Sequence, residues 1–479
     1  MPGHWTPCVP APRWQTSRIA PQSIINNRQP TIHPALEAIR LATIGTPYEG
    51  RLWLVGGAVR DELLGRAVSN DFDIVLETPA EDLARFLFER RISSIAPVTY
   101  PRFGTALAHV QGVNIELATA RKESYADESR KPEVEPATLE EDARRRDFTV
   151  NALLRNLHSG ELYDPLGSGL ADMDAKVLRT PLDPQATFYD DPLRMLRAVR
   201  FRWQLGFDPV TGLYESIAQE AHRLQIISAE RIRDEVVKML ILEEADRSLE
   251  DLRALGFLKV FAPELDAMKG VEQGHFHHLD VWDHTLLVVR NVGLGDLALT
   301  LAALLHDVGK PQTRFIDEEG HTRFFGHEGL GADIARGLLR RLKFSNEQIE
   351  PVVRLVKSHM RLGSSPTFTA AAARRLIRDL GDDVDRLLKL VEADANALRP
   401  GVKKLDLGPI QERIEEASLA TPRHQLESPL SGKEIMEITG LPAGPEIGKL
   451  KEMLVEKVLE GELGPGDKEG AARLIRRSP

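Results

Sequence analysis

The chain has 479 residues, of which 42% are hydrophobic and 28% are charged, and its formal net charge is −10. This length predicts roughly three or more structural units of ordinary globular composition, and the acidic balance argues against non-specific coating of nucleic acid, which needs clustered Lys and Arg. The single Cys8 excludes an intrachain disulfide and a thiolate zinc site, and no apolar run is long enough to span a bilayer, so we expect a cytoplasmic protein that does not bind membranes.

The first 36 residues contain no acidic residue, are rich in proline, and carry Arg13, Arg18 and Arg28. This composition has some likeness to a targeting segment, but the prolines would break the amphipathic helix that such a segment needs. We therefore expect a disordered N-terminal extension over residues 1–36.

The first chemical motif is a Gly-Gly turn that follows a short apolar run. Residues 52–55 read as a buried strand, and Gly56 and Gly57 allow a tight turn whose N–H groups approach a triphosphate at the start of the next helix. Arg60 lies on that helix, one turn in. A Gly-Gly turn alone is weak evidence for a site, because short motifs recur without function.

Two aspartates follow in the segment Asp71-Phe72-Asp73-Ile74-Val75. This alternation is typical of a strand and projects both carboxylates from one face, where their oxygens can hold two Mg²⁺ ions. Such ions activate a 3′-hydroxyl and stabilise a leaving pyrophosphate. Glu116, on a further alternating strand over 113–118, is predicted to add a third carboxylate. The order of strand, Gly-Gly helix and Asp-x-Asp strand predicts nucleotidyl transfer.

A basic helix face comes next, because Arg194, Arg197 and Arg200 recur at i, i+3, i+6 spacing after Asp190 and Asp191. A carboxylate accepts hydrogen bonds and a guanidinium donates them. An Asp/Arg pair therefore matches the amino group and unprotonated ring nitrogen that adenine and cytosine share. Uracil and guanine would mismatch both partners, at roughly 1–3 kcal/mol per wrong contact. The segment is predicted to select A and C without a nucleic-acid template; a salt-bridged surface is the alternative.

Together these motifs resemble those of the class II tRNA nucleotidyltransferases, the CCA-adding family that includes bacterial poly(A) polymerases. The family's ribose-recognising motif is similar to residues 145–152, which implies that Arg146, Asp147 and Asn151 contact ribose and phosphates. The base-reading motif, usually Glu-Asp-x-x-Arg, is here residues 190–194, with Asp190 in place of Glu. The remaining motifs resemble the family's hinge, at residues 164–169 with Asp172 and 179–181, and its neck helix, at residues 228–232 with Glu235 and Lys238.

The resemblance implies an α+β fold, in which a small mixed-sheet head like that of polymerase β precedes all-helical neck, HD and tail domains. It also implies template-independent addition of the 3′-terminal CCA, or of its final A, to the 3′ end of tRNA from CTP and ATP, with Mg²⁺ in the head. The tRNA 3′-hydroxyl would attack the α-phosphate in line.

The segment 121–142 bears on the product of the reaction. Relatives restricted to C addition lack a flexible loop before the ribose motif, and this long polar segment with Arg130-Lys131-Pro132 resembles that loop retained. It favours terminal A addition, by a complete CCA enzyme or by an A-adding specialist. The acidic net charge and the segment 266–400, described next, argue against a poly(A) polymerase. The presence of both Asp71 and Asp73 argues against the alternative of an RNA-binding phosphohydrolase with a degenerate head.

Residues 266–400 carry a second constellation of side chains. Residues 297–305 read as a buried helix that ends at His306-Asp307, with Gly309 and Pro311 terminating it. Imidazoles and carboxylates without thiols suit Mn²⁺, Fe²⁺, Co²⁺, Ni²⁺ or Mg²⁺ better than structural zinc. The predicted metal ligands are His284, His306, Asp307, His327, His359 and Asp394.

The order of these ligands resembles the fuller metal-binding pattern of the HD phosphohydrolase superfamily. That resemblance implies a metal-dependent phosphodiesterase or phosphatase, with Mn²⁺ or Ni²⁺ as candidate ions. A 2′,3′-cyclic phosphate at a damaged tRNA end would be a suitable substrate. The alternative is a helical domain that only supports tRNA. His275, His277 and His278 receive no role.

The predicted organisation is an extension over 1–36, a head over 37–155, a helical neck over 156–265 that binds base and RNA, an HD domain over 266–400 and a helical tail over 401–479. In the tail, Ser431 with Glu434 is a capping box, and Ile447, Leu450, Leu454 and Val458 form one apolar face. We expect the tail to pack on the body or to grip the tRNA elbow. The sequence leaves the oligomeric state open.

Overall fold

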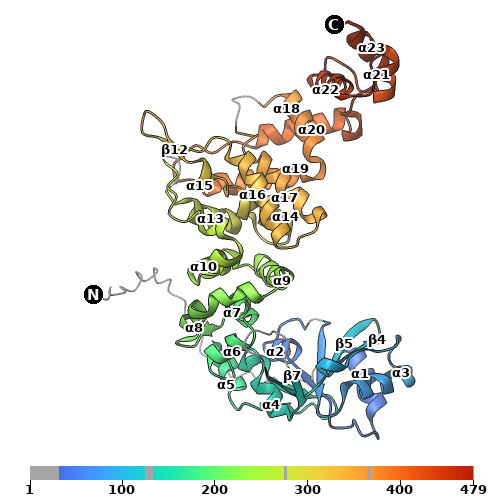
Figure 1. The fold of residues 1–479 in the computed structure, drawn as a ribbon, viewed down its shortest axis with the longest axis vertical. Coiled ribbons are helices and arrows are strands. Elements are labelled where there is room, and N and C mark those ends of the chain that lie inside the picture. Colours follow the sequence, from blue (N-terminus) through green and yellow to red (C-terminus); the bar gives the residue numbers. More distant parts are fainter. Residues whose placement is uncertain (1–31, 69, 125–132, 275–277, 364–367, 478–479) are drawn as a thin grey trace.

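A computed structural model describes residues 32–477 except 69, 125–132, 275–277 and 364–367. Figure 1 shows an elongated molecule with the strands of the head at one end, green helices next to them, and the C-terminal helices at the other end. Most of the predicted extension, residues 1–31, lies outside the described residues. Helix α1 (Pro34–Thr43) begins before the expected boundary at residue 37, because Pro34 occupies its first turn and the His33 side chain accepts a hydrogen bond from Ala35 N.

The head is built on a mixed sheet, as predicted, and this sheet has seven strands. Only β2 and β5 pair in parallel; the other neighbours are antiparallel. The strands in sheet order are β3 (Val98–Tyr100), β4 (Thr105–Val110), β5 (Val113–Thr119), β2 (Phe72–Leu76), β1 (Trp53–Val55), β8 (Leu154–Asn156) and β9 (Leu162–Tyr163). The sheet thus continues past the predicted head boundary at residue 155, because β9 pairs with β8. The head helices are α1, α2 (Gly57–Leu63), α3 (Ala80–Glu89) and α4 (Leu139–Arg144), with 3₁₀ turns η1 (Pro101–Phe103) and η2 (Thr149–Asn151).

The segment 121–142, expected to be a flexible loop, is ordered at both ends. Strands β6 (Arg121–Ser124) and β7 (Glu133–Pro136) pair antiparallel, and Thr138 starts α4 with a capping box to Glu141. The expectation of a loop was therefore wrong for these flanks, because local polarity hid a strand pairing and a helix cap. Arg130-Lys131-Pro132 lies outside the described residues.

Helices follow the head sheet, as predicted, apart from the short parallel pair β10 (Val177–Leu178) and β11 (Asp208–Pro209). The helix α7 packs against α9 and α10 and ends at Gly206, whose φ of 71° allows the left-handed cap. The elements are α5 (Gly169–Asp174), α6 (Pro184–Asp190), α7 (Leu193–Leu205), α8 (Leu213–Glu220), η3 (Ala221–Ile226), α9 (Ala229–Leu240), α10 (Ala245–Ala254), α11 (Phe257–Phe261) and α12 (Pro263–Asp266).

The next group of helices surrounds the predicted metal ligands. Helix α14 covers Leu297–Leu305, the range predicted from the sequence, and is almost entirely buried. A small hairpin of β12 (Phe315–Ile316) and β13 (Thr322–Arg323) projects at the edge of this group (Figure 1). The other elements are α13 (Val281–Val292), α15 (Lys310–Thr313), α16 (His327–Arg341), α17 (Asn346–Ser358), α18 (Ala370–Leu380), η4 (Gly381–Asp383) and α19 (Val384–Asn396).

Residues 430–475 form a second, smaller core that packs on α18, whereas Ile410, Ile414 and Ala417 belong to the main core. Ile447, Leu454 and Val458 are buried in the smaller core, with Leu450 packed against it, and the Ser431–Glu434 capping box is present, as predicted. Arg375 pairs with Glu456 at 2.7 Å across the junction with α18. The elements are α20 (Gly408–Ala420), η5 (Arg423–Gln425), α21 (Gly432–Thr439), α22 (Pro445–Glu460) and α23 (Lys468–Arg477). Within the described residues, no helix combines the length and apolarity needed to cross a membrane.

Candidate functional site

The head sheet brings the three predicted carboxylates together. Strands β2 and β5 are parallel neighbours whose register places Asp73 opposite Glu116, and Asp71 immediately precedes β2. Burial and the charges of Glu116 and Asp71 together raise the pKa of Asp73 to about 6, against the lowering effect of Arg146 and Arg197. The carboxylates therefore repel one another electrostatically, and a bound cation would relieve that repulsion.

The Gly-Gly turn lies directly against this acidic cluster. Gly56 precedes α2 with a φ of 77°, and a Cβ added there would lie 3.4 Å from Asp73 Oδ2. Glycine thus permits both the left-handed backbone and the close approach of the turn to the carboxylate. The predicted phosphate-binding turn and the predicted metal ligands form one site.

Arg60 has protein partners rather than an open position. Its side chain is only 6% exposed, it pairs with Asp61 at 2.8 Å, and its Nη1 donates to Asn151 Oδ1 at 2.8 Å. The guanidinium carbon also lies 5.0 Å from the centre of the Phe201 ring. In this structure Arg60 ties α2 to the ribose motif, and contact with a triphosphate stays a prediction.

The ribose motif continues this connection toward the neck. Asn151 Nδ2 donates to Asp147 Oδ1 at 3.0 Å, and Arg197 Nε donates to Asp147 Oδ2 at 2.7 Å. Burial raises the pKa of Asp147, but Arg197 and Asn151 lower it by more, to about 2. Asp147 is therefore a charged junction between the head and α7.

Arg146 is held by a second buried carboxylate, that of Asp142. Arg146 Nη2 lies 2.8 Å from Asp142 Oδ2, and Arg145 Nη2 lies 2.7 Å from Asp142 Oδ1. Burial raises the pKa of Asp142, yet the two arginines bring it below its ordinary value. Arg146 also lowers the pKa of Asp73. The positive charge of Arg146, in the ribose motif, therefore acts on the acidic cluster.

The predicted base-reading residues are each fixed by a neighbour. Asp191 Oδ1 accepts from Leu193 N at 3.1 Å, and Oδ2 pairs with Arg231 at 3.1 Å. Arg194 donates to the backbone carbonyls of Thr187 and Arg145 at 3.3 and 2.6 Å. Asp190 is the last residue of α6. These contacts hold Asp191 and Arg194 in place at the junction of α6 and α7.

The three arginines of α7 differ in their surroundings. Arg200 is buried and pairs with Glu235 of α9 at 2.7 Å, whereas the Arg197 side chain is 33% exposed. Burial and the neighbouring Arg197 lower the pKa of Arg200, although Glu235 opposes this. Arg200 joins two neck helices, and its predicted contact with a nucleotide has no support in this geometry.

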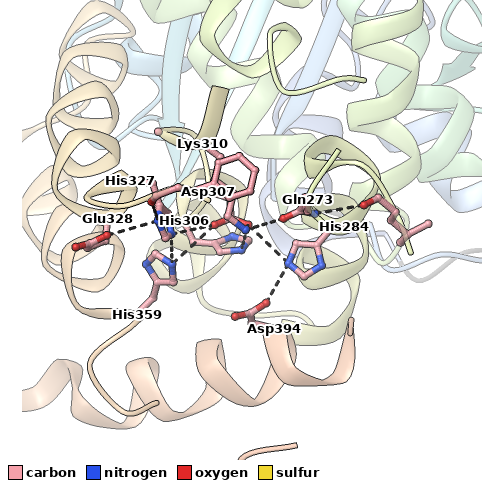
Figure 2. A network of polar contacts seen from close by, with 12 residues as sticks. Gln273, His284, His306, Asp307, Lys310, His327, Glu328, His359 and Asp394 are labelled. Atoms are coloured by element: carbon pink, nitrogen blue, oxygen red, sulfur yellow. Dashed lines mark hydrogen bonds and ion pairs between the residues drawn. The ribbon is translucent and has the colours of Figure 1, made fainter. Parts of the chain in front are cut away.

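All six predicted ligands of the second site converge, as Figure 2 shows. Asp307 lies at the centre: its Oδ2 is 3.1 Å from His306 Nε2 and 3.8 Å from His284 Nε2, and its Oδ1 is 3.4 Å from His327 Nε2 and 3.9 Å from His359 Nε2. Asp394 Oδ1 lies 3.0 Å from His284 Nε2. Two groups that could hold a metal ion share Asp307, namely His284 with His306 and His327 with His359.

The histidine tautomers favour a cation at the centre. The Nδ1 atoms of His306, His327 and His359 lie 2.7–2.8 Å from the carbonyls of Ala303, Phe324 and Val356. A carbonyl only accepts, so each Nδ1 carries a proton, and each ring directs an Nε2 lone pair inward when it is neutral. His327 Nε2 and His359 Nε2 lie only 3.2 Å apart, and a cation between them would remove the lone-pair repulsion. The donor set therefore fits a divalent metal.

The electrostatic surroundings of His359 favour the neutral form of its ring. Burial and the neighbouring His306 lower the pKa of His359 to about 4. Burial lowers the pKa of His306 as well, but Asp307 raises it by more. Burial raises the pKa of Asp307, while His306 and Lys310 bring it well below the ordinary range. Asp307 is thus a carboxylate, as a metal ligand must be.

A close backbone approach positions these ligands. A Cβ added at Gly309 would clash with His327 O and lie 2.9 Å from Gly331 N. Only glycine lets the His306-Asp307 turn touch the start of α16, which carries His327. Gly309 therefore acts on the geometry of the site, beyond ending the preceding helix as the sequence predicted.

Sequence reasoning missed several residues of these sites. Lys310 Nζ lies 2.6 Å from both Asp307 Oδ2 and Gln273 Oε1, and its i+3 spacing from Asp307 could have indicated the first contact. Arg231 and Asp142 were also missed, because their partners are known only after folding.

The comparisons with known proteins place the chain in a family. A poly A polymerase head domain matches residues 52–179, a probable RNA and SrmB-binding site of polymerase A matches residues 206–269, and an HD domain matches residues 276–395. An A-adding tRNA nucleotidyltransferase of Deinococcus radiodurans is 36% identical over 87% of this chain and 94% of its own. The chain belongs to the tRNA nucleotidyltransferase family.

Two further relatives of this tRNA nucleotidyltransferase bear on its fold and product. A CC-adding tRNA nucleotidyltransferase of Thermus thermophilus is also 36% identical, over 88% of this chain and 93% of its own. The CCA-adding enzyme of Bacillus stearothermophilus, solved in complex with CTP, is similar over 93% of this chain and 98% of its own, with a TM-score of 0.66 and 25% identity. The identities do not separate an A-adding from a CC-adding relative, so the product must be argued from the site.

Proposed function

We propose that this tRNA nucleotidyltransferase adds the 3′-terminal CCA, or its final A, to tRNA from CTP and ATP. The observation that carries the proposal is the placement of Asp73 opposite Glu116 and against the Gly56 turn. Asp71, Asp73 and Glu116 would hold Mg²⁺, which supplies charge stabilisation at the attacking and leaving oxygens.

The chain's own residues orient the substrates around that centre. The turn at Gly56 and Gly57 brings the backbone to the triphosphate, and Arg146 acts on the same region, since its charge lowers the pKa of Asp73. Asp147 and Asn151 are joined to this region through the contact of Asn151 with Arg60. Asp191 and Arg194, fixed by Arg231 and by carbonyl contacts, select adenine or cytosine. The tRNA 3′-hydroxyl attacks the α-phosphate in line, and pyrophosphate leaves.

Segment 121–142 supports terminal A addition. Its flanking pair β6 and β7 leads directly through α4 to the ribose motif at Arg145, so an insertion at this place acts on nucleotide binding. We therefore favour a complete CCA enzyme or an A-adding specialist. The D. radiodurans relative is named A-adding.

The head assignment is tested by the variant Asp71→Ala. We expect it to lose both C and A addition while keeping its fold by circular dichroism, because a hard-cation ligand is removed from an exposed position. Incorporation at the wild-type level in this variant would refute the metal assignment.

A second activity, metal-dependent phosphohydrolysis in the HD domain, is favoured by the convergent Nε2 atoms around Asp307. Mn²⁺ or Ni²⁺ would fit the imidazole-rich donor set. We expect metal-stimulated hydrolysis of 2′,3′-cyclic AMP by the full chain. The variant Asp307→Ala should lose this hydrolysis and retain nucleotide addition; equal hydrolysis by the variant would contradict the assignment.

A further inference from the structure

A short hairpin connects two residues of the HD site. Lys310 contacts Asp307, His327 lies beside it, and the chain between them forms β12 and β13. The hairpin therefore leaves the site after Lys310 and returns to it at His327, both of which are buried. Figure 1 shows it projecting from the edge of the HD helices.

This hairpin exposes an unusual amount of apolar surface. Phe325 is 77% exposed, more than any other aromatic side chain in the described part of the chain, and Ile316 and Phe315 are 62% and 42% exposed. The rings of Phe315 and Phe325 are 5.5 Å apart between centroids. Large exposed apolar clusters are uncommon on protein surfaces and mark binding sites.

The hairpin that carries Phe315 is held by contacts within it. Phe315 pairs with Arg323 across the hairpin, Arg323 Nε lies 2.8 Å from Asp317 Oδ2, and His321 N donates to Asp317 Oδ1 at 2.8 Å. The exposed rings therefore stand on a preorganised scaffold, which lowers the entropic cost of binding a ligand.

The aromatic pair is also close to the hydrolytic centre. Phe325 is two residues from His327, a separation of at most about 7 Å between Cα atoms. The preceding Phe324 accepts a hydrogen bond from His327 at its carbonyl and lies with its ring 5.5 Å from Lys310 Nζ. A ligand whose phosphate contacts Lys310 would therefore have its remaining portion near the segment that carries Phe325.

We propose that Phe315 and Phe325 form a nucleobase-stacking subsite, so that the HD site takes nucleotides or RNA ends rather than simple phosphoesters. This inference rests on the phosphohydrolase activity proposed above. In a 2′,3′-cyclic phosphate, a water oxygen bonds to phosphorus, one bond from phosphorus to a ribose oxygen breaks, and that oxygen takes the proton. Base stacking on one aromatic side chain changes affinity roughly 5- to 100-fold.

The first test compares two substrates that differ only in the base. Hydrolysis of 2′,3′-cyclic AMP and of the abasic 1-O-methylriboside 2′,3′-cyclic phosphate is measured with the full chain and Mn²⁺. We expect Phe325→Ala to raise KM for 2′,3′-cyclic AMP at least fivefold and to leave KM for the abasic substrate unchanged. Phe325→Trp should restore the wild-type KM, and Leu419→Ala, which removes an 87% exposed side chain from α20, should have no effect. An unchanged KM in Phe325→Ala would overturn the subsite.

The second test does not depend on hydrolysis. An 8-azidoadenosine 2′,3′-cyclic phosphate is photolysed with the full chain while excess ATP and CTP fill the head. We expect crosslinks to the peptide containing Phe325, lost in Phe325→Ala and competed by 2′,3′-cyclic AMP. Crosslinks elsewhere would overturn the subsite. Failure of the wild type to hydrolyse either substrate would instead refute the phosphohydrolase activity, and the crosslinks would then decide the subsite alone.

Discussion

Asp147 shows how one buried carboxylate joins the ribose motif to the neck. It accepts hydrogen bonds from Asn151 and Arg197, and its pKa in the folded chain is about 2, below the ordinary 3.8. A carboxylate with a lowered folded pKa stabilises the fold above its unfolded pKa, and this contribution disappears as the pH falls toward the folded value.

The corresponding prediction concerns Asp147→Asn. We expect this variant to lose about 2 kcal/mol of unfolding free energy at pH 7, with the difference from wild type narrowing as the pH falls from 5 to 3. Urea unfolding followed by circular dichroism measures the unfolding free energy of the variant and of the wild type at each pH. The control is Asp174→Asn, on the exposed side of α5. A difference that does not change with pH would show that the ionic contact is unimportant.

A second prediction at the residue scale concerns base choice. Arg194→Ala removes a guanidinium held by two carbonyls, and should reduce discrimination against UTP and GTP by roughly 5- to 150-fold, because about 1–3 kcal/mol of mismatch is lost. Incorporation from each of the four triphosphates measures it. Rejection of UTP and GTP at the wild-type level would argue against base reading by Arg194.

Single residues could be predicted where local sequence determines their place. Asp73 and Glu116 lie on alternating strands, and His306 follows a buried helix, so their positions follow from periodicity together with the family resemblance. Arg200 could not be interpreted in this way, because its partner Glu235 lies on another helix. The ion pair between Asp191 and Arg231 could not be predicted from the sequence either, because tertiary packing brings the two residues together.

At the scale of elements, the contact between the Gly309 turn and α16 determines the HD geometry. Gly309→Ala should push α16 away from His306-Asp307, because its Cβ would meet the backbone at Gly331 N and His327 O. We expect a loss of bound Mn²⁺, measured by equilibrium dialysis with metal analysis, and a stability loss of about 1–3 kcal/mol.

Gly329→Ala provides the matched control for this prediction. It lies on the same helix, and an added Cβ would meet no atom within 4 Å. If both variants bound Mn²⁺ as the wild type does, the close approach at Gly309 would not position the ligands.

The elements themselves were predicted unevenly. The helix over 297–305 and the apolar face of α22 match the expectations, because each has a strong apolar pattern. The flanks of segment 121–142 were misread, because short polar strands such as β6 and β7 depend on pairing with each other.

At the scale of the whole molecule, the two candidate sites belong to separate parts of an elongated chain (Figure 1). The acidic cluster is built by the head sheet, and the six-ligand cluster is built by the HD helices. The sheet of the head extends past residue 155, because β9 pairs with β8, and the sequence alone did not indicate this pairing.

The separation predicts independent activities. Asp73→Asn should lose nucleotide addition and keep hydrolysis of 2′,3′-cyclic AMP, because no HD ligand lies on the head sheet. Asp307→Ala should instead lose hydrolysis of 2′,3′-cyclic AMP and keep nucleotide addition. Parallel assays of both activities on both variants measure this, and loss of both activities in one variant with an intact fold would show that the sites are coupled.

The most direct measurement is nucleotide incorporation by the purified chain on tRNA transcripts that end at the discriminator base, after one C and after CC, with CTP and ATP supplied separately and together. We predict A addition to the CC-ended transcript, and addition of CCA to the shortest transcript would identify a complete enzyme. If C were added to the two shorter transcripts and A were added to none, this result would contradict the inference from segment 121–142. No incorporation on any transcript would contradict the proposed function itself.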